Sequence, residues 1–64
     1  MVIPKSRLDT FRRDQNLRLG QALHNHLELH KVTNREDAAW CDKLWNADDV
    51  IAAEMIRSVT DYNN

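Results

Sequence analysis

The sequence predicts a small all-α domain, with one long N-terminal helix and two shorter helices packed along it as a small bundle. Leu19, Leu23 and Leu27 recur at the i, i+4, i+8 spacing of a helical stripe. Two further apolar stripes each follow a residue type that caps helix N-termini. The one proline stands at position 4 and interrupts none of these stripes. Together these observations favour helices over strands throughout the chain.

The first helix is expected over residues 7–29, after an N-terminal arm at residues 1–5. Ser6 is the expected N-cap, since Asp9 follows at the three-residue spacing of a capping box. Leu8 begins the apolar stripe, which the polar residues 14–16 interrupt. This interruption indicates either a kink in the helix or a break between two helices.

The second helix is expected over residues 34–45. Thr33 and Glu36 have the spacing of a capping box, and the acidic first turn suits the helix dipole. Four residues give the helix an apolar face: Ala38, Cys41, Leu44 and Trp45.

The third helix is expected over residues 47–60, capped by either Asn46 or Asp48. Its apolar face includes Val50, Ile51, Met55 and Val59. Tyr62 is expected to fold back over the end of this helix, and residues 61–64 to fray.

Length and composition predict a single domain spanning residues 1–64 in the cytoplasm. A chain of 64 residues buries only about 60% of its unfolded surface, so a partner would help to stabilise it. One cysteine excludes an intramolecular disulfide and suits a reducing compartment. No apolar run approaches the roughly 18 residues of a membrane span. Residues 1–4 lack the basic and long apolar regions of a signal peptide, so we expect a soluble intracellular protein.

Gly20 interrupts the long helix and predicts a close approach by another backbone. A glycine inside a helix costs about 1 kcal/mol relative to alanine, and a packing reason usually offsets this cost. The neighbour is either another helix of the chain or a second copy. A broad apolar stripe on a long helix favours a homodimer through that helix, with Gly20 near the crossing.

The predicted packing or interface residues combine this stripe with the two tryptophans. Trp40 and Trp45 are five positions apart, so they point about 140° from each other on a helix. We therefore expect one to be buried and the other to pack at a partner surface, where tryptophan is enriched. The full set is Gly20, Leu23, Leu27, Trp40 and Trp45.

Charge is distributed unevenly along the chain. Residues 1–18 carry five basic and two acidic side chains, a net of +3, whereas residues 31–64 carry four basic and seven acidic, a net of −3. Such asymmetry steers association with a charged partner or an antiparallel second copy, or it reflects two solvated faces. Arg12, Arg13 and Arg18 are the predicted charged rim of an interface.

Two histidines and the cysteine are the candidate metal ligands. His26 and His30 share a helix face at i, i+4, and Cys41 lies on the next helix. There is no second cysteine, and a histidine near a helix C-terminus also suits the dipole. We predict no metal or other cofactor, and interpret the histidines as solvated, helix-capping or pH-sensing groups.

Nucleic-acid binding and catalysis have less support. The arginines do not share one helix face, and the sequence pI is about 6.2, whereas nucleic-acid-binding domains usually have a concentrated basic face. A helix-turn-helix formed by the second and third helices would present Asp48 and Asp49 to DNA. No glycine-rich phosphate loop or nucleophile with an evident base is present, so we predict no enzyme.

One segment resembles a group of very short phage, prophage and bacterial reading frames. The pattern is Arg-x-Gly-Gln-Ala-x-x-Asn, formed here by residues 18–25, and a comparable apolar and acidic stretch follows at residues 44–48. The resemblance covers about two-thirds of the chain. It implies a small helical fold in a phage-like context, with the host cytoplasm as its location, and it transfers no catalytic residue.

The predicted function is that of a small, non-catalytic regulator that binds a protein. The resemblance implies a phage-encoded inhibitor or modulator of a host protein, acting by occlusion of a surface. The alternatives are a nucleic-acid-associated regulator that uses the basic N-terminal half, and a structural protein that assembles with itself. The salt dependence of binding separates the protein-binding regulator from the nucleic-acid-associated one, because phosphate contacts weaken steeply as salt rises.

Overall fold

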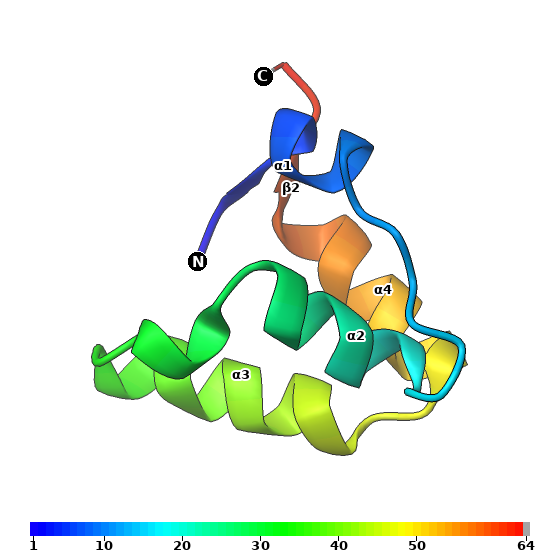
Figure 1. The fold of residues 1–64 in the computed structure, drawn as a ribbon. Helices are drawn as coiled ribbons and strands as arrows, with labels where there is room; N and C mark the ends of the chain where they lie inside the picture. Colours follow the sequence, from blue (N-terminus) through cyan, green and yellow to red (C-terminus); the bar gives the residue numbers. More distant parts are fainter. Residues whose placement is uncertain (64) are drawn as a thin grey trace.

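The computed structural model describes residues 1–63 and confirms a mostly helical chain; Asn64, the last of the residues expected to fray, lies outside the described residues. Figure 1 shows α2 above α3, with α4 beside both. The elements are β1 (Ile3–Pro4), α1 (Lys5–Asp9), α2 (Leu19–His26), the 3-10 helix η1 (Leu29–Lys31), α3 (Arg35–Asn46), α4 (Asp49–Val59) and β2 (Thr60–Asp61).

The core lies where α2 meets α3 and α4. Leu23 and Leu44 are its largest fully buried side chains. Ala52 is also fully buried and lets α4 approach closely, since alanine has no side chain beyond its methyl group. Partly buried residues such as Phe11 and Ile56 pack around this centre. None of the described helices combines the length and apolarity needed to cross a membrane.

The prediction of one long helix over residues 7–29 is wrong. The Asp14 carboxylate accepts a hydrogen bond from the Asn16 backbone N–H at 2.9 Å, and its carbonyl accepts one from Leu17 at 3.0 Å. These bonds offer the backbone a turn in place of a helix. The polar run is therefore a break, and residues 10–18 form an irregular connection between α1 and α2.

The C-terminal end of α2 also differs from the prediction. Glu28 has φ 55°, the left-handed conformation in which helices commonly end, although glycine is the usual residue there. Its N–H donates to the Asn25 carbonyl at 3.2 Å. The chain then turns into η1 and places Leu29 in the core.

The N-terminal arm is ordered by a contact that the sequence did not predict. Ile3 pairs with Thr60, and Pro4 with Asp61, in a short parallel contact between β1 and β2. Ile3 is buried at 4% exposure, which favours this position over a solvated arm. The predicted cap at Ser6 is wrong, because α1 begins at Lys5 after extended Pro4 with no side-chain cap.

The caps of α3 and α4 are asparagine and aspartate side chains. The Asn34 carbonyl oxygen accepts from the Asp37 N–H at 3.1 Å, so Asn34 is the cap and the capping box expected at Thr33 is wrong. Asp48 accepts from the Ile51 N–H at 2.9 Å, which confirms one of the two predicted caps of the last helix. Asp61, expected to fray, lies in β2.

The close approach at Gly20 occurs within the chain. Gly20 is buried, and a Cβ atom placed on it would overlap the Leu44 carbonyl oxygen and lie 3.4 Å from the Ala52 Cβ. The neighbouring backbone is therefore the end of α3, which was one of the two alternatives that the sequence allowed. Only glycine lets α2 lie this close to the carbonyl.

We predict that Gly20→Ala destabilises the protein by about 1–3 kcal/mol, the usual cost of overpacking a core. Helix propensity alone predicts the opposite sign, a gain of about 1 kcal/mol. Urea unfolding measures the difference, with Asn25→Ala on the exposed side of α2 as the control. A Gly20→Ala protein as stable as the wild type would contradict the close packing.

Candidate functional site

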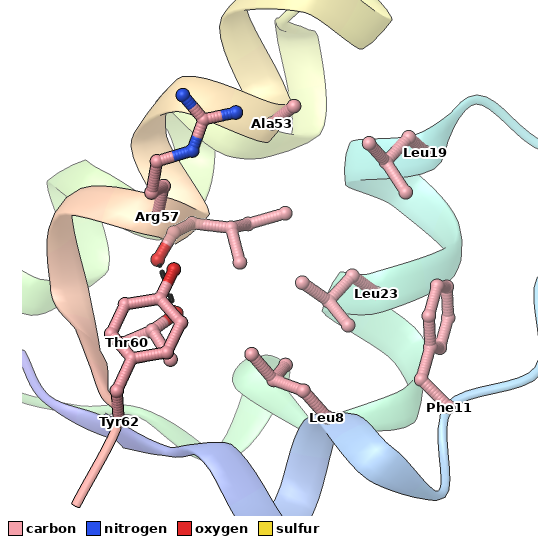
Figure 2. A pocket seen from close by; sticks show the side chains of 9 residues that line it. Leu8, Phe11, Leu19, Leu23, Ala53, Arg57, Thr60 and Tyr62 are labelled. Atoms are coloured by element: carbon pink, nitrogen blue, oxygen red, sulfur yellow. Dashed lines mark hydrogen bonds between the residues drawn. The ribbon is translucent and has the colours of Figure 1, made fainter.

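A mainly apolar hollow lies between α2 and α4, and Figure 2 shows it from close by. Its volume is about 270 Å³. Its lining residues are Leu8, Phe11, Leu19, Leu23, Ala53, Ile56, Arg57, Thr60 and Tyr62. We refer to this surface as the groove.

One wall of the groove is a single face of α4. Ala53, Ile56 and Thr60 follow one another at the i, i+3, i+7 spacing that keeps residues on one side of a helix. Ala53 is small, which leaves room between the helices. The Thr60 hydroxyl donates to the Ile56 carbonyl at 2.6 Å, so its polar atom is satisfied within its own chain segment. This wall is therefore mainly apolar.

The opposite wall comes from α2 and from the segment around α1. Leu19 and Leu23 project from α2 across the groove from α4 (Figure 2). Phe11 packs its ring against His26, with ring centroids 5.4 Å apart. The His26 Nε2–H donates to the Arg7 carbonyl at 2.8 Å and so satisfies an acceptor at the end of α1. His26 thus positions this wall, in keeping with its interpretation as a capping group.

Two exposed arginines near the groove have no acidic partner among residues 1–63. Arg57 lines the groove, and Arg12 follows Phe11 on the other side. Among the residues that the structure describes, neither arginine forms an ion pair or a side-chain hydrogen bond. Both side chains belong to exposed residues, so each guanidinium can meet an acidic group of a ligand.

The other two predicted rim arginines hold the connection between α1 and α2 in place. Arg13 pairs with the Asp49 carboxylate at 2.8 Å, and Arg18 donates to the Trp45 carbonyl at 3.2 Å. The second oxygen of Asp49 accepts from the Leu19 N–H at 2.9 Å. Asp49, at the start of α4, therefore holds the start of α2 in place.

The bond from the Leu19 N–H, together with Arg13, holds the pKa of Asp49 below its usual value. Because the folded-state pKa is the lower one, these contacts stabilise the fold fully above the usual aspartate pKa. Their contribution is lost as the pH falls through the lowered value.

We predict that Asp49→Ala is less stable than the wild type at neutral pH and that this deficit shrinks on acidification. Thermal unfolding of both proteins between neutral and strongly acidic pH measures it. Asp42→Ala, at an exposed position of α3, is the matched control and should show a smaller deficit. A deficit that is constant across the pH range would contradict the assigned role.

The predicted interface residues fall into two groups. Gly20, Leu23 and Leu27 are buried inside the chain, so they pack within the fold. Trp40 is partly buried against the core, whereas Trp45 is 37% exposed. Neither tryptophan is fully buried, which differs from the expectation that one would be, and only Leu23 of the whole set lines the groove.

His24 packs beside Trp45 in an environment that disfavours its protonated form. Its ring meets the indole edge-on, with centroids 5.0 Å apart, and its Nδ1 is buried without a hydrogen-bond partner in the described chain. Burial lowers the pKa of His24, and nearby His30 adds to the effect, while Asp42 opposes it. The unfolded chain therefore binds a proton at a higher pH than the folded chain.

We predict that acidification below the usual histidine pKa of about 6.5 destabilises the wild type partly through His24. The loss begins as the unfolded state protonates and is complete below the lowered folded-state pKa. His24→Phe keeps a ring against Trp45 and should lose less stability over this range, as measured by urea unfolding. Asn25→Phe, at an exposed position of α2, is the control and should lose as much stability as the wild type. Equal losses in His24→Phe and the wild type would contradict the assignment.

The candidate metal ligands do not form a common site. His26 contacts the Arg7 carbonyl, His30 is exposed, and Cys41 is buried in the core. Within residues 1–63, no three His, Cys, Asp or Glu side chains come together so as to hold a metal ion. Burial, with Asp37 and Asp42 nearby, raises the pKa of the Cys41 thiol and disfavours the reactive thiolate.

Sequence reasoning missed Ala53 and Arg57 as residues of a site. The available signal was their spacing with Ile56 along one side of the last helix. Tyr62 was expected to fold back, and it does line the groove, although 62% of it is exposed. The wall opposite depends on the break at residues 14–16, which makes it hard to infer without the fold.

Comparison of the chain with protein-family models, with curated proteins and with solved structures finds no match.

Proposed function

We propose that this chain is a non-catalytic regulator that binds an amphipathic segment of a partner protein in the groove. The observation that carries the proposal is the apolar groove between α2 and α4, with the Arg57 guanidinium at its edge and no ion pair to it within residues 1–63. Recognition of an amphipathic helix by an apolar groove is a recurring mode of peptide binding. The apolar side chains of the partner would enter between Leu19 and Ala53.

The chemistry of the walls favours a protein segment over a phosphate-bearing ligand. Leu8, Phe11, Leu19 and Ile56 are all only partly buried, so they leave apolar surface for a ligand to cover. A volume of about 270 Å³ is small for a drug-sized molecule and suits one or two anchoring side chains. Arg57 favours an acidic residue beside those anchors.

The resemblance of residues 18–25 to short phage reading frames supports a more specific form of the proposal. The partner is then a protein of the bacterial host cytoplasm, and binding inhibits or redirects it by covering a functional helix. Nucleic-acid binding has less support from the geometry, because Arg13 and Arg18 already bind Asp49 and the Trp45 carbonyl.

We predict that Ala53→Glu abolishes capture of the partner by placing a carboxylate inside the apolar groove. The matched control is Ala39→Glu, the same substitution at an exposed position of α3 outside the groove. Each protein is immobilised and exposed to bacterial lysate with nuclease present, at low and high salt. The expected result is one dominant protein retained by the wild type and Ala39→Glu, and lost with Ala53→Glu.

Arg57→Glu should weaken capture of the same protein, most strongly at low salt, because it reverses the charge at the edge of the groove. Lys43→Glu, an exposed charge reversal on α3, is its control. Equal capture by Ala53→Glu and the wild type would contradict the groove as the binding site. Recovery of only nucleic-acid-binding proteins, lost with nuclease, would instead favour the nucleic-acid alternative.

A further inference from the structure

The outer side of α4 carries an exposed stripe that the fold leaves uncovered. Val50, Glu54 and Arg57 succeed one another at i, i+4 and i+7, which places them on one side of the helix. Val50 is 70% exposed, although valine is a residue usually found inside proteins. Glu54 and Arg57 are exposed and form no ion pair within the described residues.

We propose that this stripe binds the same stripe of a second copy of the chain, with the two α4 helices antiparallel about a two-fold axis. In an antiparallel pair, a step forward on one helix is a step backward on the other. A register that sets Glu54 of one copy opposite Arg57 of the second copy therefore also sets Arg57 opposite Glu54. The two-fold axis therefore generates two equivalent ion pairs between the copies.

The apolar part of the stripe completes the contact. In this register Val50 of one copy lies opposite position 61 of the second copy, next to Tyr62, which is 62% exposed. Valine and tyrosine then cover each other at both ends of the interface.

The order of charges identifies a second copy as the occupant. A partner that recognises a purely basic or purely acidic surface needs charges of one sign. This stripe instead carries one acid, Glu54, and one base, Arg57, three residues apart. Such an arrangement is self-complementary only under a two-fold axis, which is the commonest symmetry of protein dimers. The Gly20 face cannot serve this purpose, because the chain's own α3 covers it.

The proposed dimer surface and the groove overlap only in part. Glu54 does not line the groove, so its substitution tests the dimer alone. Arg57 and Tyr62 belong to both surfaces, and a bound partner would therefore compete with the second copy.

Charge reversal tests the pairing directly by sedimentation equilibrium at low salt. The wild type is expected to dimerise, whereas Glu54→Arg and Arg57→Glu should each dimerise at least roughly tenfold more weakly, since like charges then face each other. An equimolar mixture of the two variants should form a heterodimer, because every pair is again complementary. The double variant Glu54→Arg/Arg57→Glu should also recover self-association.

Lys43→Glu on α3 is the charge-reversal control and should dimerise like the wild type. Circular dichroism of every variant checks that the exposed substitutions leave the helices folded. A wild type that stays monomeric at its highest soluble concentration would overturn the proposal. Single variants that dimerise like the wild type, or folded variants that fail to associate when mixed, would overturn the antiparallel register.

Discussion

The packing of α2 at Gly20 against the end of α3 is the constraint on which the other contacts depend. Without a side chain at this position, α2 reaches the Leu44 carbonyl and lies against Ala52 of α4. This approach buries Leu23 at the centre of the fold. A longer residue at position 20 would push α2 outward and separate the three helices, because the obstructing atom belongs to the backbone and not to a flexible side chain.

The groove results from the position that the Gly20 contact gives to α2. Once α2 is seated, Leu19 and Leu23 face α4 across a gap that Ala53 is too small to fill (Figure 2). Asp49 ties the start of α2 to the start of α4 through the Leu19 N–H and Arg13. The same contacts direct the preceding connection back along the fold, so that α1 closes one end of the groove. The groove thus arises from the contacts between the helices, which hold its walls apart.

Local sequence signals predicted the second half of the chain well and the first half poorly. The Asp48 cap and the apolar stripe after it indicate a helix ending near Val59, because capping and periodicity are local properties. The break at Asp14 was visible only as an ambiguity, since Asp49, which also holds Arg13 and the Leu19 N–H, lies 35 positions further along the chain. The pairing of Ile3 with Thr60 left no local signal at all. Gly20 indicated a close approach, but only the fold shows which backbone makes it.

The most direct test of this account is a nuclear Overhauser measurement on the folded protein in solution. Contacts between the Gly20 α-protons and the Ala52 methyl group are expected, together with an interruption of helical contacts between α1 and α2. A continuous series of helical contacts across residues 7–29, without any contact from Gly20 to Ala52, would contradict it. That result would restore a single long helix and remove the groove.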